Sequence, residues 1–546
     1  MAAKMKVGGA IAEILKREGV DVIFGYPRNA VLEEAAAIGI RPIIVRQERT
    51  GVHMADALSR LTRGKRMGVF AMQHGPGTEN AYGGVAQAYS ESVPVLVLPQ
   101  GYARHIAHVP DNYNASISMR DVTKHAEPIT LPEQTSNIMR RAFTQLRNGR
   151  LRPVLVEMPW DVLAEEIDAP EHYEPVVRVR CGPDPDDVRK VAQRLVQADR
   201  LVIHAGQGVH WANAYAELKA LAELLAAPVS TSLEGKSAFD ETHPLALGSG
   251  GAAIPGQLRH FLDHADVILG IGCSFGETAF GVRMPPGKEI IHATLDSADL
   301  NKSVPCSQAL VGDAKLTLAA LHEACRELLN APHDAEPVAR EIAAVEKDWL
   351  AEWLPLLTSD DAPLSPYRVL WDLQQTVDVA NTIITHDAGS PRDQLTPFWK
   401  SITPLSYIGW GKSTQLGYGL GLAMGAKLAC PDKLCINVWG DAAIGFTGMD
   451  FETAVRERLP ILSILLNNEA MAIELPIMPV ATERYRATDI SGDYAAFARA
   501  LGGHGERVTR PEDIVPALHR ALAAIEGGKP ALVEFITAKE TRASRL

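Results

Sequence analysis

The residues best suited to chemistry in this 546-residue chain are a carboxylate and a pair of amides, each directly after an apolar run. Asp441 follows the first run, and Asn467 and Asn468 end the second. Between these motifs the 24 residues 443–466 leave room for one helix and one strand. Mg²⁺ prefers octahedral oxygen ligands and keeps phosphate oxygens among them. Asp441, the Asn468 amide oxygen and the carbonyl of Ala470 are therefore predicted to hold Mg²⁺ and, through it, a diphosphate.

These two motifs resemble the thiamine diphosphate signature, in which Gly-Asp-Gly is followed by an Asn pair about two dozen residues later. Ala442 stands where the signature has its third residue, a Gly. The resemblance implies that the cofactor contacts Asp441 and Asn468 together with Ala442, Ala443, Ala470 and Met471. The alternative interpretation of the same residues is an ordinary strand–helix–strand connection.

A second motif near the N-terminus supports the same cofactor. Residues 43–60 resemble the acetolactate synthase-like family of thiamine diphosphate enzymes, in which a strand ends in Glu and a helix follows. Glu48 stands where that family keeps the carboxyl that pairs with the cofactor's pyrimidine ring and activates it, which is general base catalysis through the cofactor. A surface carboxylate at a helix N-terminus is the alternative. Because both motifs occur in the family's order, the resemblance implies dependence on thiamine diphosphate and Mg²⁺.

Two further segments match cofactor-binding positions of that family. Gly389 and Ser390 follow a strand, and the resemblance implies that their backbone N–H groups face the diphosphate. Thr414 and Gln415 precede Leu416, which takes the place of the bulky apolar residue that bends the cofactor. The alternatives are a plain strand-to-helix turn for the first segment and an ordinary core leucine in the second.

Positions that face the substrate differ among relatives of this family. Gln73 stands where benzoylformate decarboxylases have a catalytic His, and sulfoacetaldehyde acetyltransferase-like sequences also have Gln there. A neutral amide orients a substrate oxygen but does not titrate. His74 and His108 are candidates for an acid or base, although a lone His near glycines is structural about as often as catalytic.

Glu474 lies seven residues after Asn467, where pyruvate and indolepyruvate decarboxylases carry an essential Glu. Acetolactate synthases have an apolar residue at that position. The resemblance implies that Glu474 passes protons to and from the reacting substrate. A solvent-facing helix Glu is the alternative.

Other positions depart from both groups of enzymes. Asn29 replaces the Asp of the keto-acid decarboxylases, whereas Ile477 replaces a Trp of the acetolactate synthases. Residues 272–279 lack the Arg-rich character of the acetolactate synthase central domain, which disfavours flavin binding and acetolactate synthesis. A Gly-x-Gly turn at Gly206–Gly208 leaves a nucleotide or a CoA thioester open, because this motif alone is weak evidence.

Three segments in which apolar strand-like runs alternate with helical periods must position these residues. This alternation predicts an α/β fold of three doubly wound parallel-sheet domains. We expect a pyrimidine-binding domain at 1–165, a central domain at 184–330 and a diphosphate-binding domain at 364–546, with an acidic linker at 164–175. Family architecture places Glu48 of one subunit at the diphosphate clamp of another, so we expect a homodimer or homotetramer.

Composition narrows the class of protein. A net charge of −12 without a basic stripe argues against nucleic acid or an anionic membrane as partner. No apolar run approaches the ~20 residues needed to cross a bilayer, and the N-terminus lacks a signal-peptide core, so a cytoplasmic location is expected. Six cysteines without Cys-x-x-Cys pairing indicate buried, reduced thiols.

The function favoured by these residues is a carbon–carbon lyase that acts on a 2-hydroxyacyl substrate, including a CoA thioester, or on an acyloin-like substrate. An acetolactate synthase-like carboligase and a 2-keto-acid decarboxylase are the alternatives within the enzyme class. A catalytically degraded, cofactor-binding paralogue is a further alternative, which only Ala442 suggests.

Overall fold

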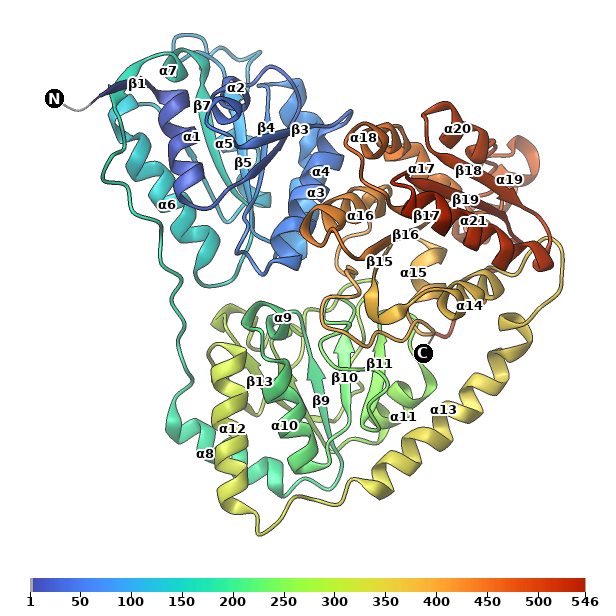
Figure 1. Cartoon of the computed structure of the whole chain (residues 1–546). Helices are drawn as coiled ribbons and strands as arrows, with labels where there is room; N and C mark the ends of the chain where they lie inside the picture. Colours follow the sequence, from blue (N-terminus) through green and yellow to red (C-terminus); the bar gives the residue numbers. More distant parts are fainter. Residues whose placement is uncertain (1–2, 546) are drawn as a thin grey trace. The chain divides into compact units, whose positions relative to one another are not determined.

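The computed structural model describes residues 3–545, which contain three parallel sheets and one short antiparallel strand pair (Figure 1). The chain divides into two compact units. The first unit contains the chain as far as Val179 together with residues 417–432 and 445–461. The second contains Arg180–Leu416, Lys433–Ile444 and the chain from Leu462 onward.

The sheet of the first unit has six parallel strands in the order β3-β2-β4-β5-β7-β6. Their bounds are β2 Val22–Gly25, β3 Arg41–Ile44, β4 Gly68–Met72, β5 Val95–Gly101, β6 His125–Pro128 and β7 Val154–Pro159. Helices α1 (Val7–Arg17), α2 (Ala30–Ala37) and α6 (Thr135–Arg147) pack on one face, and α3 (Glu48–Leu61) and α4 (Pro76–Ser90) on the other. Because helices cover both faces, the inner strands are almost wholly apolar.

The predicted acidic linker is partly a strand. Residues Glu166–Asp168 form β8, which pairs antiparallel with β1 (Lys4–Lys6). The prediction missed this pairing because both strands are only three residues long, which is too short for their polar–apolar–polar alternation to indicate a strand. Short helices α5 (Ala115–Ser118) and α7 (Trp160–Leu163) complete this part of the chain.

Helix α16 (Tyr418–Ala429) and helix α18 (Phe451–Arg456) also belong to the first unit. Small residues let α16 lie close against α3. A Cβ atom added at Gly421 would lie 2.5 Å from Cβ of His53, and one added at Gly425 would lie 2.4 Å from the carbonyl oxygen of Met54. Glycine at these two positions is therefore required by the close helix packing.

The central sheet lies in the second unit and has the strand order β11-β10-β9-β12-β13-β14, all parallel. Its strands are β9 Leu201–Ala205, β10 Val229–Ser232, β11 Ala246–Gly250, β12 Val267–Ile271, β13 Glu289–Thr294 and β14 Gln308–Val311. One apolar core joins it to α8 (Pro185–Val196), α10 (Tyr215–Leu225) and α12 (Ala314–Leu328), and a second to α11 (Gly256–His264). The long helix α13 (Glu336–Leu357) leads to the third sheet.

The third sheet, also in the second unit, has the parallel order β15-β16-β17-β19-β18. Its strands are β15 Thr382–His386, β16 Leu434–Gly440, β17 Leu462–Asn467, β18 His504–Val508 and β19 Ala531–Ile536. Helices α14 (Pro366–Thr376) and α21 (Ile514–Glu526) pack on one face. Around the strand ends lie α15 (Ser390–Leu395), α17 (Asp441–Thr447), α19 (Pro479–Tyr485) and α20 (Tyr494–Ala500).

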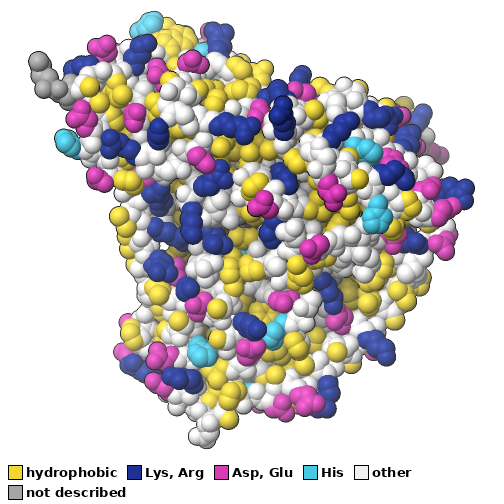
Figure 2. Space-filling view, in the orientation of Figure 1, with side chains coloured by type: hydrophobic (Ala, Val, Ile, Leu, Met, Phe, Trp, Pro, Cys, Tyr) yellow, Lys and Arg dark blue, Asp and Glu magenta, His cyan; other side chains and the backbone are white. Residues whose placement is uncertain are grey.

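The three parallel α/β sheets confirm the predicted fold class, and the strands of each sheet lie inside the predicted domain ranges. Figure 2 shows acidic and basic side chains intermixed on the face drawn. No helix within residues 3–545 is both long and apolar enough to cross a membrane. All six cysteines are free thiols, but burial was predicted too broadly: Cys325 and Cys435 are buried, Cys181 is exposed, and the other three are half-buried.

Candidate cofactor site

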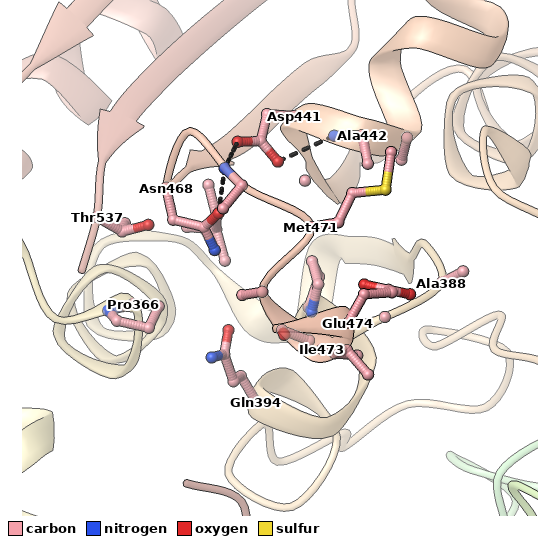
Figure 3. Close-up of a pocket in the computed structure, with 18 of the residues that line it drawn as sticks. Pro366, Ala388, Gln394, Asp441, Ala442, Asn468, Met471, Ile473, Glu474 and Thr537 are labelled. Atoms are coloured by element: carbon pink, nitrogen blue, oxygen red, sulfur yellow. Dashed lines mark hydrogen bonds between the residues drawn. The ribbon is translucent and has the colours of Figure 1, made fainter. Parts of the chain in front are cut away.

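A pocket opens at the carboxyl ends of β15, β16, β17 and β19 in the second unit (Figure 3). Ligands of open parallel sheets bind at such strand ends, where loops with backbone N–H groups converge. Of the residues predicted to bind cofactor or metal, the pocket brings together Gly389, Ser390, Leu416, Asp441, Ala442, Ala443, Asn468, Ala470 and Met471. Thr414 and Gln415 are half-buried on the chain before Leu416 and do not line it.

Asp441 and the loop after β17 form one wall of this pocket. Oδ1 of Asp441 accepts the N–H of Ala442 at 2.9 Å, and Oδ2 accepts the N–H of Ala470 at 3.3 Å. Oδ1 of Asn468 accepts the same Ala470 N–H at 3.1 Å. Asp441 and Asn468 thus place a carboxylate and an amide oxygen next to each other (Figure 3).

The charge at Asp441 fits a bound cation. This carboxyl is 4% exposed, and burial raises its pKa to about 6 although backbone N–H donors oppose the shift. Within residues 3–545 no basic side chain forms an ion pair with it. A buried carboxylate without a countercharge is costly, and a divalent cation removes that cost. The described residues include no cluster of three or more His, Cys, Asp or Glu side chains, so amide and carbonyl oxygens would supply the remaining protein ligands.

The turn after β15 exposes its backbone toward the pocket. Gly389 has φ = 85°, a left-handed conformation that favours glycine, and Ser390 begins α15 directly after it. Such a turn leaves backbone N–H groups available to an anion. Leu416, predicted to bend the cofactor, is half-buried and lines the pocket, which favours this role over that of an ordinary core leucine.

Glu474 also lines the pocket, in the 3₁₀ turn Ala472–Glu474 that follows the loop after β17. Figure 3 shows it with Ile473 and Gln394 on the side of the pocket opposite Asp441 and Asn468. The side chain is half-buried, which argues against a plain solvent-facing Glu. Ile477, which replaces the acetolactate synthase Trp, is 73% exposed.

Glu48 is the first residue of α3 in the other compact unit and is only 4% exposed, so the surface-carboxylate alternative is wrong. Burial raises the pKa of Glu48, and the nearby carboxylate of Asp450 adds to the rise, whereas hydrogen bonds from its own backbone N–H and from Asn80 oppose it. Asp450 in turn accepts the N–H of Arg46 at 2.8 Å, just before α3 begins.

Gln73 and His74 follow β4 and precede α4 in the same unit as Glu48. The imidazole of His74 contacts the rings of Tyr102 and Trp160, with centroids 4.6 and 5.0 Å away. Burial and the charge of Arg28 lower the pKa of His74, which favours the neutral ring at pH 7. His108 is exposed in the loop after β5, and in residues 3–545 no hydrogen bond or ring contact joins it to His74.

Sequence reasoning missed several residues of the pocket. Pro366, Gln394, Ile473, Thr537 and Ala538 line it, but no motif marked them. Thr537 follows the predicted strand that ends the third sheet, so the rule that ligands bind at strand ends could have indicated it. Gln394 lies on α15 a few residues after Gly389, and no sequence pattern distinguishes it.

Comparisons with known proteins agree with this geometry. Residues 5–125 match the N-terminal cofactor-binding domain of thiamine pyrophosphate enzymes. Thiamine pyrophosphate is another name for thiamine diphosphate. Residues 188–321 match their central domain and residues 387–535 their C-terminal binding domain. The fold and the pocket therefore define a thiamine diphosphate enzyme.

Proteins similar in sequence to the whole chain indicate which family of thiamine diphosphate enzymes it belongs to. A probable acetolactate synthase large subunit of Methanocaldococcus jannaschii is 30% identical, over 97% of this chain and 92% of the relative. The large subunit of Escherichia coli acetolactate synthase isozyme 3 is 28% identical over 95% and 92%, and that of Corynebacterium glutamicum acetolactate synthase 27% over 99% and 88%. The chain belongs to the acetolactate synthase-like family of thiamine diphosphate enzymes.

Proposed function

We propose that the protein is a thiamine diphosphate- and Mg²⁺-dependent carboligase of the acetolactate synthase kind. Such an enzyme joins two pyruvate molecules into a branched five-carbon hydroxy keto acid and releases one CO₂. The observation that carries this proposal is the match to proteins named acetolactate synthase over nearly the whole chain. That match favours carboligation over the lyase reaction that the sequence motifs alone favoured.

The proposed roles of the residues follow from their surroundings. When bound, the cofactor supplies a nucleophilic carbon that attacks the substrate's keto group. Asp441 and Asn468, with the Ala470 carbonyl, hold the cation that carries the diphosphate, and the turn at Gly389 and Ser390 faces its oxygens. Leu416 limits the cofactor's conformation.

Glu48 is proposed to activate the cofactor. Its burial and the charge of Asp450 favour a carboxyl that keeps its proton, and such a carboxyl donates a hydrogen bond to a ring nitrogen. In the family architecture this group serves the diphosphate clamp of a second subunit, so we propose a homodimer or homotetramer. A cytoplasmic location is part of the same proposal.

Cleavage or decarboxylation is the second candidate, because Glu474 places a carboxyl in the pocket where acetolactate synthases have an apolar residue. This carboxyl would protonate the carbon freed after CO₂ leaves and so release an aldehyde in place of a ligated product. None of the three relatives described above is named for a 2-hydroxyacyl-CoA substrate. Against a degraded paralogue stand the buried Glu48 and the arrangement of Asp441 and Asn468.

The test is product analysis with purified protein, thiamine diphosphate and Mg²⁺. Incubation with ¹³C-labelled pyruvate followed by NMR should show the five-carbon hydroxy keto acid and CO₂. Acetaldehyde as the main product would replace the proposal by decarboxylation. If pyruvate is not consumed, a panel of other 2-keto acids, acyloins and 2-hydroxyacyl-CoA thioesters tests the remaining reactions, and turnover of a thioester alone would restore the lyase.

A further inference from the structure

The fully buried carboxylate of Glu534 connects the end of β17 to the neighbouring strand β18 of the third sheet. Glu534 lies on β19, is 0% exposed, and pairs in register with Leu465 of β17. Its Oε1 accepts Nδ2 of Asn467 at 2.7 Å and Nη2 of Arg507 at 2.9 Å. Its Oε2 accepts the N–H of Ala495 and Nε of Arg507, both at 3.0 Å. Four donors therefore satisfy this buried charge.

The side chain of Asn467 links Glu534 to the loop that follows β17. While its Nδ2 donates to Glu534, its Oδ1 accepts the N–H of Glu469 at 3.0 Å. Glu469 has φ = 56°, a left-handed conformation that is unfavourable for a side chain with a Cβ. The chain reverses at this residue and directs the N–H of Ala470 to Asp441. Asn467 thus fixes the turn that places Asn468 and Ala470.

The second carboxylate oxygen of Glu534, Oε2, is connected to Asp441 through helix α20. The Ala495 N–H that it accepts lies in the first turn of α20, directly after Tyr494. The hydroxyl of Tyr494 donates to the backbone carbonyl of Asp441 at 3.4 Å. One carboxylate therefore anchors both segments that contact Asp441.

We propose that Glu534 is a positioning residue for the metal site and acts through Asn467. The two asparagines of the pair then have different tasks: Asn467 shapes the loop, and Asn468 offers its oxygen to the cation. This inference rests on the proposed Mg²⁺ site, and it assigns a role to a residue 67 positions away from Asn467 in sequence.

Asn467→Ala tests the inference. In this variant Ala495 and Arg507 still donate hydrogen bonds to Glu534, so the buried carboxylate keeps most of its partners. Groups that orient metal ligands cost about 10–100-fold in metal affinity when they are removed. We expect Asn467→Ala to weaken Mn²⁺ binding, measured by EPR in the presence of thiamine diphosphate, by at least about 10-fold.

Asn437→Ala is the matched control. Asn437 lies in the adjacent strand β16, is fully buried, and neither polar atom of its side chain has a hydrogen-bond partner among the described residues. Asn437→Ala also replaces a buried Asn by Ala in the third sheet, but it leaves the loop after β17 unchanged. We expect its Mn²⁺ affinity to stay within about 2-fold of wild type. Equal affinity in Asn467→Ala and wild type, or an equal loss in Asn437→Ala, would overturn the inference.

Glu534→Gln keeps the test decisive if Asn467→Ala does not fold. The neutral amide cannot accept from all four donors, so the Asn467 bond weakens and Mn²⁺ affinity should fall in the same direction. Unchanged affinity in this variant would contradict the proposal. Wild type and Asp441→Ala test the proposed metal site itself: if wild type fails to bind Mn²⁺, or Asp441→Ala binds it equally well, the metal site is wrong.

Discussion

A buried ion pair at the contact of α3 with α16 provides a test of what stabilises the first unit. Arg60 donates from Nε and Nη2 to the two carboxylate oxygens of Asp56 at 2.9 and 3.1 Å, and from Nη2 to the hydroxyl of Tyr418 at 2.8 Å. The Arg60 side chain is 4% exposed and that of Asp56 1%. Replacing Arg60 by Met keeps an unbranched apolar stem but leaves the Asp56 carboxylate without its countercharge.

The burial of this ion pair determines how much free energy of unfolding Arg60→Met is expected to lose. Removal of one partner of a buried pair costs about 3–5 kcal/mol, because the remaining charge is not compensated. For a cooperative unit of 150–250 residues this corresponds to a fall in Tm of about 6–20 °C. Fully buried Glu91 also contributes negative potential at Arg60, so the variant removes a positive charge that more than one acidic group faces.

The loss of stability should depend on pH in a defined direction. Burial raises the pKa of Asp56 even though Arg60 opposes the rise, and Arg60→Met raises it further. An acid whose folded-state pKa exceeds its unfolded value contributes stability below the unfolded pKa, and this stability is lost as pH rises through the folded pKa. The gap in Tm between variant and wild type should therefore be widest at pH 7–8 and narrow toward pH 5.

Differential scanning calorimetry across this range is the assay, with two controls. Arg41→Met removes an arginine whose side chain is 53% exposed and pairs with Glu457, and exposed pairs contribute at most about 1 kcal/mol. Arg60→Met combined with Asp56→Asn removes one uncompensated charge and should recover part of the loss. A Tm for Arg60→Met equal to that of Arg41→Met, or a deficit independent of pH, would refute the reasoning.

The remaining predictions concern the site. Glu48→Gln should keep the fold and most cofactor affinity but slow exchange of the cofactor's C2 proton, measured by NMR; near-native exchange would contradict its role. Asp450→Asn keeps the acceptor for Arg46 but removes a charge that raises the pKa of Glu48, so that pKa should fall and the alkaline limb of the exchange profile should move to lower pH. Asp441→Ala should weaken Mg²⁺ and cofactor together in calorimetric titrations with and without EDTA, and cofactor affinity indifferent to both changes would exclude the clamp. Glu474→Gln should lower turnover by about 10²-fold if this carboxyl moves protons; an unchanged rate of product formation would leave it outside the reaction.

The fold class and the position of Asp441 and Asn468 at strand ends were predictable because both depend on local patterns. Apolar runs marked several strands in each of the three sheets, and Asp441 and Asn468 follow two of these strands directly. The boundaries of the compact units were not predictable in the same way. Residues 417–432 and 445–461 lie within the sequence range of the third domain but belong to the first unit, since the glycines of α16 allow it to pack against α3.

Residues that orient the site escaped prediction for a different reason. Asp450 accepts a hydrogen bond from Arg46, 404 positions away, and Glu534 acts on Asn467 through the pairing of β17 with β19. Such contacts exist only once the elements have packed, and one sequence contains no spacing rule for them. A buried Glu in a strand is the single local hint for Glu534, because an unpaired charge there would be too costly to keep.

Two buried carboxyls, one in each compact unit, illustrate how surroundings give the same group different chemistry. Burial raises the pKa of both Glu48 and Asp441. Around Asp441 the partners are backbone N–H groups without a countercharge, so the charged form is retained and a cation completes it. Burial raises the pKa of Glu48 and the neighbouring Asp450 carboxylate adds to the rise, so these surroundings disfavour the charged form relative to an exposed Glu. When neighbours differ in this way, one acid is suited to hold a metal and the other to activate a cofactor by hydrogen bonding.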